Sequence, residues 1–253
     1  MRQDERAPFV AALQTAREAA YPPGEYVGQE SFMTAGEIRR LAARAGITRD
    51  VPVLDLCCGT GGPGRLITAE TGCRYLGVDY SADAVRIARD LARDLPCRFE
   101  VAHLPPLPDG PFEVVLLLET MLAFADKRAL LRGVARVLEP GGRFAFTVEE
   151  GRPLTTRERR RTPDADTVSL IAWSGLTAGL RKAGLMVIWQ EDCSASHHAT
   201  AVALLQCFRA DEADIVRTIG GQATAELLVA HQLWTEWLGS GRVRKFAVVA
   251  EKR

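Results

Sequence analysis

From Val51 onward, apolar segments typical of strands alternate with segments that have the spacing of amphipathic helices. The strand candidates include "VPVLDLCC", "RYLGVDY", "CRFEVA", "FEVVLLLE" and "GRFAFTVEE", and helices are expected over residues 63–71, 82–95 and 126–138. Strands with continuous apolar runs are covered on both faces, as in a parallel sheet. The alternation therefore predicts an α/β fold with a doubly wound, Rossmann-like, mostly parallel sheet.

Further helices are predicted before and after this alternation. Ser31 could cap a helix over 32–45, which follows an earlier helix over 5–20. After the polar segment 151–166 come a helix over 167–183, a strand over 185–192, a helical stretch over 195–239 and a last strand over 245–252. We therefore expect a helical N-terminal lid (1–48), a core (49–194), a helical cap insertion (195–241) and a closing strand (242–253).

Composition narrows the classes of partner. Lys plus Arg and Asp plus Glu both number 32, so the formal net charge is zero, whereas nucleic-acid-binding domains are usually basic. The arginine run at 157–161 is expected to be a solvated face. No apolar run approaches the roughly 20 residues that span a bilayer, and the first residues lack a secretion signal. We expect no nucleic acid, no membrane and a cytoplasmic location.

Six cysteines contain no C-x-x-C pair, so no metal site is predicted. Most of them lie in apolar segments, where cysteine is usually a small buried hydrophobic residue.

Residues 59–64 read "GTGGPG", the G-x-G-x-x-G pattern of dinucleotide-binding loops. Asp55 ends the preceding strand and would place a carboxylate near a bound pyrophosphate, so it better suits the ammonium group of an amino acid. Asp79 ends the next strand and could accept hydrogen bonds from ribose, with Tyr80 available to stack on adenine. Backbone groups of Ala102 and His103 could contact the adenine edge. The loop thus indicates an adenosine ligand.

Four segments, "VLDLCCGTGG", "GVDYS", "LPPLPDGPFEVVLLLE" and "RVLEPGGRF", occur in the order and spacing of class I S-adenosylmethionine-dependent methyltransferases. Over about residues 50–150 the chain resembles the bacterial small-molecule branch of that superfamily. The resemblance implies a seven-stranded sheet with its last strand antiparallel. It also implies S-adenosylmethionine as cofactor and S-adenosylhomocysteine as product.

The resemblance also implies where the cofactor lies. Asp55, Gly59 and Gly61 would hold the methionine portion, Asp79 the ribose, and Ala102 and His103 would flank adenine, while Leu118 and Glu119 would face the methionine end. Cys57 stands where the family usually has glycine, and Val101 where many members have an acidic residue. "EYVGQESFMTAGEIRRL" resembles the family's N-terminal lid, in which Tyr26 and Gln29 could touch cofactor or substrate.

Methyl transfer depends mainly on positioning, and a base helps when the acceptor is a hydroxyl or a protonated amine. His197 and His198 follow the sixth strand and could act as base or orient the acceptor. Glu119 and Glu149, at the ends of two strands, could neutralise an ammonium substrate. Tyr26, Phe32, Trp173 and Trp234 are further candidates for the acceptor pocket. For each of these side chains ordinary packing or solvation is the competing interpretation.

The sequence therefore predicts a methyltransferase acting on nitrogen or oxygen of a small-molecule metabolite or natural-product intermediate. The partner is that acceptor, and homodimer formation is left open. One alternative keeps the cofactor but performs a cyclisation or acts as a scaffold, because a fold does not fix the reaction. An NAD-dependent oxidoreductase is the less favoured second alternative.

Overall fold

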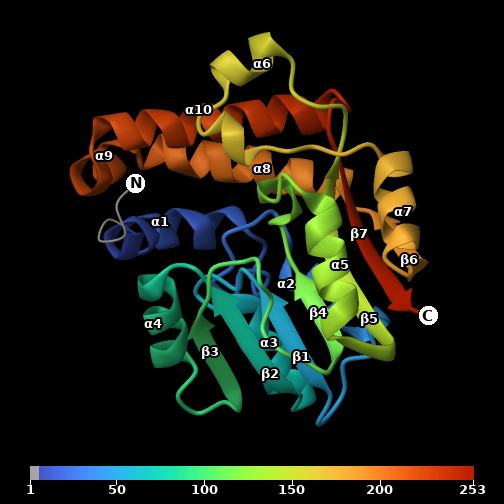
Figure 1. Ribbon diagram of the computed structural model, residues 1–253. Coiled ribbons are helices and arrows are strands. Elements are labelled where there is room, and N and C mark those ends of the chain that lie inside the picture. Colours follow the sequence, from blue (N-terminus) through green and yellow to red (C-terminus); the bar gives the residue numbers. More distant parts are fainter. Residues whose placement is uncertain (1–5) are drawn as a thin grey trace.

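A seven-stranded sheet forms the centre of the computed structural model, which describes residues 6–253 (Figure 1). The strands are β1 (Pro52–Leu56), β2 (Arg74–Asp79), β3 (Cys97–Val101), β4 (Phe112–Leu117), β5 (Leu138–Glu150), β6 (Leu185–Asp192) and β7 (Arg244–Lys252). Their order is β3-β2-β1-β4-β5-β7-β6, and β7 is antiparallel to both of its neighbours. The predicted doubly wound sheet with an antiparallel last strand is confirmed.

Helices cover both faces of this sheet. One face packs against α2 (Ala35–Arg44), α3 (Gly62–Thr71) and α4 (Ala82–Leu91), and the other against α5 (Lys127–Val137) and α7 (Trp173–Lys182). Successive strand residues alternate between the two cores, as Val53 and Leu54 do on β1. Both faces are therefore apolar, which explains the continuous apolar runs in the sequence.

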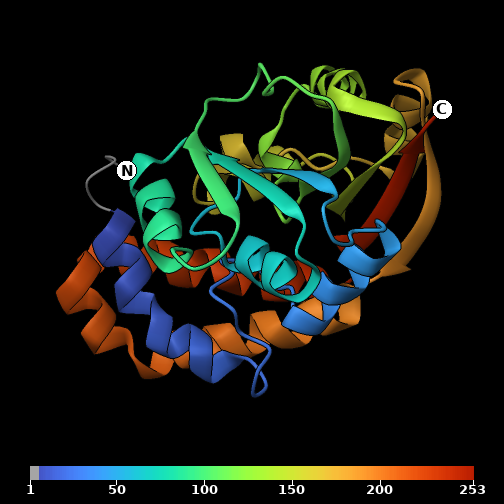
Figure 2. The same ribbon diagram turned by 90° about the horizontal axis from the view of Figure 1, so that it is seen from below.

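A separate helical layer lies beyond the carboxyl ends of β1, β2 and β4 (Figures 1 and 2). It consists of α1 (Arg6–Ala20), α8 (Ser194–Ala210), α9 (Glu212–Ile219) and α10 (Gly221–Gly239). Figure 2 shows α1 beside α8 and α9, so segments far apart in sequence form one unit. A third apolar core, which includes Leu13, Phe32 and Phe208, joins them. The predicted helical stretch over 195–239 is three helices.

Two predicted helix starts were wrong. Helix α2 begins at Ala35, because Thr34 rather than Ser31 is its N-cap and forms a reciprocal capping box with Glu37. Helix α7 begins at Trp173 rather than near 167, because Ile171 first pairs with Glu150 in a parallel bridge. Short 3₁₀ turns lie at Met121–Ala123 and Ala165–Thr167.

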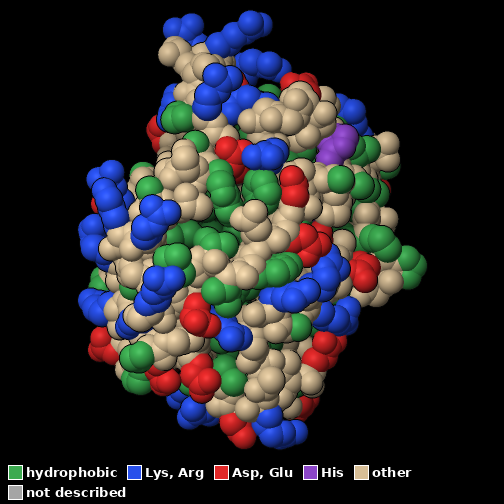
Figure 3. All heavy atoms as spheres, turned by 90° about the vertical axis from the view of Figure 1, so that its right-hand side faces the viewer, with side chains coloured by type: hydrophobic (Ala, Val, Ile, Leu, Met, Phe, Trp, Pro, Cys, Tyr) green, Lys and Arg blue, Asp and Glu red, His purple; other side chains and the backbone are tan. Residues whose placement is uncertain are grey.

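The polar segment after β5 contains a short helix, α6 (Thr156–Arg161). Its arginines Arg157, Arg159, Arg160 and Arg161 are exposed, and Lys and Arg side chains gather at the end of the molecule where α6 lies (Figure 3). The expected solvated face is therefore present, on a helix rather than a loop.

All six cysteines are free thiols, three of them buried and three half-buried. Across residues 6–253, every helix is too short or too polar to cross a membrane.

Candidate functional site

A cavity of about 750 Å³ opens at the carboxyl ends of β1, β2 and β4. This is the edge at which open α/β sheets bind ligands. Ten of the residues predicted to contact cofactor line it: Gln29, Asp55, Cys57, Gly59, Asp79, Tyr80, Ala102, His103, Leu118 and Glu119. The other two, Tyr26 and Gly61, lie outside the lining.

The loop after β1 uses left-handed backbone conformations at three positions. Cys57, Gly59 and Gly61 have φ of 61°, 54° and 74°. A Cβ on Gly59 would meet no protein atom within 4 Å, whereas one on Gly61 would lie 2.6 Å from the Phe99 ring. Gly59 therefore leaves room for a ligand, and Gly61 lets the start of α3 pack on the core. The positive φ at Cys57 gives a physical reason for glycine at this position in relatives.

Asp79 connects the ends of three strands. Its Oδ2 accepts a hydrogen bond from Gly59 N (3.0 Å) and its Oδ1 from Ser81 N (2.9 Å). Its carbonyl oxygen accepts one from Ala102 N (2.9 Å), so that amide is not available to read adenine. Each carboxylate oxygen of this cavity-lining residue can accept a further hydrogen bond, as pairing with ribose hydroxyls requires.

Asp55 is a buried carboxyl at the cavity floor. It accepts a hydrogen bond from the Tyr75 hydroxyl. Burial raises the pKa of Asp55 to about 7, and the nearby Asp79 carboxylate adds to the increase, while the Tyr75 hydrogen bond opposes it. A cation beside Asp55 would favour its ionised form.

The lid segment, residues 25–33, is tied down over the cavity. The Gln29 amide accepts a hydrogen bond from Val27 N (2.7 Å) and donates to Glu25 O and Met33 O (both 2.9 Å). A Cβ on Gly62 would lie 2.6 Å from Val27 O, so the lid backbone packs directly on α3. Gln29 thus shapes the lid with its polar atoms engaged within it.

The chemistry of the cavity suits S-adenosylmethionine, whose net charge is positive. The space above Gly59, the carboxylate of Asp79 and the buried carboxyl of Asp55 match a ribose and an α-ammonium group. Among the described residues, six carboxylate side chains line the cavity (Glu30, Asp55, Asp79, Asp83, Glu119 and Asp164), and no Lys or Arg side chain does.

Several predicted acceptor residues gather around the ammonium of Lys245, one of four lysines in the chain. Lys245 Nζ lies 2.7 Å from Glu119 Oε2 and 2.6 Å from Glu149 Oε1, and 5.5 and 5.6 Å from the ring centres of Phe32 and Trp234. Glu149, Phe32 and Trp234 do not line the cavity. The carboxylate expected to neutralise a substrate, Glu149, is therefore paired within the protein.

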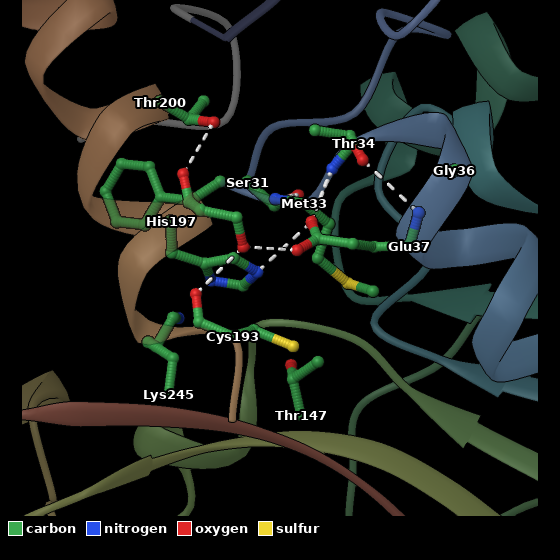
Figure 4. Close-up of polar contacts among 12 residues, drawn as sticks. Ser31, Met33, Thr34, Gly36, Glu37, Thr147, Cys193, His197, Thr200 and Lys245 are labelled. Atoms are coloured by element: carbon green, nitrogen blue, oxygen red, sulfur yellow. Dashed lines mark hydrogen bonds and ion pairs between the residues drawn. The ribbon is translucent and has the colours of Figure 1, made fainter. Parts of the chain in front are cut away.

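His197 is buried between the carboxylates of Glu37 and Glu119, and Figure 4 shows its contact with Glu37. Its Nε2 lies 3.4 Å from Glu37 Oε2 and its Nδ1 lies 3.8 Å from Glu119 Oε1. Glu37 also accepts hydrogen bonds from Ser196 Oγ (2.5 Å) and Thr34 N (2.9 Å). Of these residues only Glu119 reaches the cavity, so His197 cannot touch a ligand there directly.

The potential ligand atoms of Glu37, Cys193 and His197 lie within 4.8 Å of one another, which is the spacing of a metal site. Burial raises the pKa of the Cys193 thiol to about 12, and its Sγ donates to Glu191 O at 3.8 Å. Without a metal, Cys193 is therefore a protonated thiol beside the Glu37 carboxylate.

The remaining predicted acceptor residues lie away from the cavity. His198 packs against α10, where a Cβ on Gly239 would lie 2.9 Å from its Nε2. Trp173 packs on Phe246 with ring centres 5.2 Å apart, and Tyr26 packs on Tyr21 at 5.4 Å. These three side chains contribute to packing.

Sequence reasoning missed much of the outer lining. Ser31, Thr120, Ala123, Phe124, Asp164 and Thr167 complete that side of the cavity. They come from the lid, the turn after β4 and the segment between β5 and α7. Asp164 belongs to the polar stretch 151–166, and Thr167 directly follows it. Only the fold brings these two residues to the cavity.

Comparison with known proteins agrees with this geometry. Residues 53–142 match the family model of a methyltransferase domain. The chain therefore has the class I S-adenosylmethionine-dependent methyltransferase fold. A 27-O-demethylrifamycin SV methyltransferase from Amycolatopsis mediterranei is 32% identical over 166 residues, covering 61% of this chain and 61% of that protein. The chain spans between 39% and 61% of the first curated relatives that it matches.

Solved structures share the fold over most of the chain. Phosphoethanolamine N-methyltransferase 2 from Haemonchus contortus, in complex with S-adenosyl-L-methionine, has a TM-score of 0.79 at 17% identity. The match covers 96% of this chain and 57% of the chain of that enzyme. The cyclase SpnF has a TM-score of 0.75 at 20% identity and covers 98% of this chain and 96% of its own.

Proposed function

We propose that this protein transfers the methyl group of S-adenosylmethionine to nitrogen or oxygen of a small-molecule acceptor. The observation that carries the proposal is the cavity at the carboxyl ends of β1, β2 and β4, lined by Asp55, Gly59 and Asp79. The rifamycin-modifying relative, which acts on a natural product, supports a similar class of acceptor.

Bound S-adenosylmethionine would supply an electrophilic methyl group with a good leaving group. Asp79 would hold the ribose hydroxyls, Asp55 the α-ammonium group, and the space above Gly59 would admit the ligand close to the backbone. The lid, fixed by Gln29 and Arg65, would limit the access of water. Holding donor and acceptor in contact supplies much of the acceleration, so the residues of this cavity act chiefly by positioning.

The fold bears differently on the two alternative functions, the NAD-dependent oxidoreductase and the cyclase or scaffold. The sheet order with antiparallel β7 differs from the parallel 3-2-1-4-5-6 order of dinucleotide-binding folds, so it disfavours the NAD-dependent oxidoreductase. A cyclase or scaffold that keeps the cofactor remains the second candidate because SpnF, a cyclase, has this fold.

Isothermal titration with S-adenosylmethionine, S-adenosylhomocysteine and NAD tests the proposal. We expect both sulfur ligands to bind and NAD not to bind. Absence of binding by both sulfur ligands would overturn the proposal. Transfer of a labelled methyl group to an acceptor, detected by mass spectrometry, would eliminate the cyclase and scaffold alternative.

A further inference from the structure

Glu37, Cys193 and His197 bring an oxygen, a sulfur and a nitrogen atom together in a buried group between α2 and α8. Their potential ligand atoms lie within 4.8 Å of one another, and each residue is at most 5% exposed. Cys193 is the N-cap of α8 and His197 lies in its first turn, where His197 N donates to Cys193 O at 2.9 Å. Residues four apart share one face of a helix, so the thiol and the imidazole can meet the Glu37 carboxylate together. Figure 4 shows the ring of His197 facing that carboxylate.

The imidazole of His197 makes no hydrogen bond at either ring nitrogen among the described residues. Its Nε2 lies 3.4 Å from Glu37 Oε2, and its Nδ1 lies 3.8 Å from Glu119 Oε1, which has no hydrogen-bond partner either. In the described part of the chain, six buried side-chain atoms lack such a partner, and three of the six belong to this contact. Buried polar groups are nearly always paired, so three unpaired atoms around one ring indicate that a partner is missing.

The spacing of the three potential ligand atoms suits a tetrahedral metal ion. Zinc is bound at about 2.0–2.3 Å, so its ligand atoms lie about 3.3–3.8 Å apart. The 3.4 Å between Glu37 Oε2 and His197 Nε2 is such a distance, and the Cys193 sulfur needs to approach by only about 1 Å to complete it. Binding through both oxygens of Glu37 would give the ion four ligand atoms. Thiolate and imidazole ligands together favour zinc over magnesium or calcium.

Glu119 has the position of the outer partner that a zinc-binding histidine needs. A histidine that binds metal through one ring nitrogen usually donates a hydrogen bond from the other nitrogen to a carboxylate, which fixes the orientation of the ring. His197 Nδ1 faces Glu119 Oε1, and the Lys245 ammonium holds Glu119 Oε2 at 2.7 Å. With the proton on Nδ1, the lone pair of Nε2 is available to the metal.

We propose that Glu37, Cys193 and His197 bind a zinc ion, with Glu119 as the hydrogen-bond partner of His197. The Cys193 thiol releases its proton to water as the sulfur–zinc bond forms, and no electron is transferred. The inference does not depend on the proposed methyl transfer. The absence of a C-x-x-C pair argued against a metal site in the sequence, but here a single cysteine combines with a histidine four residues later and a glutamate from a distant helix.

This zinc site is structural. None of its three protein ligands lines the cavity, and closed sites of this kind hold elements together rather than activate a substrate. The ion joins α2, which follows the lid, to the first turn of α8. Zinc enters such a site while the chain folds around it, so no path through the folded protein is needed.

The first test is the zinc content of protein produced without a histidine tag in zinc-supplemented cells, measured by inductively coupled plasma mass spectrometry. We expect about one zinc ion per chain in the wild type and less than about one-tenth in Cys193→Ser and His197→Gln. Cys207→Ser and His198→Gln are matched controls from the same helix and should keep the ion, because neither residue belongs to the group.

The second test uses only the wild type, produced in minimal medium with cobalt in place of zinc. Cobalt bound to a thiolate gives a charge-transfer band in the near ultraviolet, and tetrahedral cobalt gives strong visible bands. We expect both. This measurement decides the question even if the Cys193 and His197 variants do not fold.

The third test separates the outer partner from the ligands. Glu119→Gln should still bind zinc, but with an affinity about 10- to 100-fold lower in competition with a chelator. Glu150→Gln is its control, because Glu150 pairs with Arg244 outside the group and should leave the affinity unchanged.

A wild type with less than about one-tenth of a zinc ion per chain, or a cobalt protein without the thiolate band, would overturn the proposal. So would equal loss of zinc from Cys207→Ser and Cys193→Ser. An unchanged zinc affinity in Glu119→Gln would overturn its assignment as the partner of His197. None of these measurements requires S-adenosylmethionine to bind, so failure of the proposed function would leave them unaffected.

Discussion

Lys245 Nζ lies 2.6 Å from Glu149 Oε1, and both side chains are almost completely buried on neighbouring antiparallel strands. The same ammonium reaches Glu119, so a lysine of β7 neutralises carboxylates at the ends of β4 and β5. Buried ion pairs of this kind do not add much stability compared with apolar packing, but losing one partner is costly.

Lys245→Met is therefore expected to lower the free energy of unfolding by about 3–5 kcal/mol at neutral pH, because Glu119 and Glu149 lose their ammonium. The loss should shrink as the pH falls far enough to protonate Glu119, whose pKa the Lys245 ammonium keeps below its ordinary value. Urea denaturation measures it. Lys182→Met, at an exposed position, is the control and should change the free energy by less than about 0.5 kcal/mol. Equal stability of the two variants would contradict the burial of Lys245 between Glu119 and Glu149.

Gly59 and Gly61 separate ligand binding from stability. Gly61→Ala places a Cβ 2.6 Å from the Phe99 ring at positive φ, and should destabilise the protein by about 2–4 kcal/mol. Gly59→Ala meets no protein atom and should cost only about 1 kcal/mol, while filling space meant for the ligand. Thermal unfolding and titration with S-adenosylmethionine measure the two effects. If Gly61→Ala kept its stability but lost affinity for S-adenosylmethionine, Gly61 would serve ligand binding rather than packing.

Asp55 should make cofactor binding depend on pH. Its folded-state pKa of about 7 is above the ordinary value of 3.8. The unfolded chain therefore ionises first, and this residue lowers the stability of the free protein as the pH rises from 3.8 to about 7, with no further loss above that. An α-ammonium group needs the ionised form. We therefore expect the affinity for S-adenosylmethionine to rise with pH up to about 7 and then level off. Titrations at pH values from about 5.5 to about 8.5, on both sides of this pKa, test the expectation.

Asp55→Asn removes the titrating group and is the control for that experiment. Its affinity should be lower and nearly independent of pH across the same range. A wild-type affinity that is flat across pH 7 would show that Asp55 is not beside the ammonium group.

Asp79→Ala removes the acceptor for two backbone amides and for the expected ribose hydroxyls. The affinity for S-adenosylmethionine should fall at least about tenfold, because buried donors lose their partner. Asp83→Ala, an aspartate of the same cavity that pairs with Arg86, should lower it much less. Equal losses in the two variants would mean that only cavity charge, and not the geometry of Asp79, matters.

Glu37 should make stability sensitive to acid. Burial raises its pKa, but the His197 imidazole 3.4 Å away and hydrogen bonds from Ser196 and Thr34 outweigh burial and lower it to about 2. Because this is below the ordinary 4.5, the stabilisation is present above pH 4.5 and is lost as the pH falls toward 2. In Glu37→Gln that loss of roughly 2–3 kcal/mol should disappear, as measured by denaturation at each pH. An unchanged acid dependence would exclude the His197 pairing.

The sheet and the residues that line the cavity at the ends of β1 and β2 were predictable because they depend on local features. A ligand-facing loop directly follows a strand, so Asp55, Gly59 and Asp79 could be assigned from their distance to the strand ends. The signal for Thr34 as the cap of α2, a Thr with Glu37 three residues later, was also local and was overlooked.

The surroundings of the predicted acceptor residues were not predictable in the same way. Glu149 was expected to neutralise a substrate ammonium, and Phe32 and Trp234 were expected to line the acceptor pocket. All three instead surround the ammonium of Lys245. Lys245 lies in an apolar strand where nothing in the sequence distinguishes a buried lysine from a solvated one. Its partners come from four other elements, and only tertiary packing brings them together.

The position of β7 between β5 and β6 also has a consequence for synthesis. Every other strand leaves the ribosome before β7 does, so β5 and β6 remain open edges until the last strand emerges. During that interval the apolar β5 can pair with another nascent chain, and its Glu149 has no cation. The same late insertion closes the sheet and supplies Lys245. The pairing of Glu119 and Glu149 with Lys245 therefore forms only after β7 has emerged.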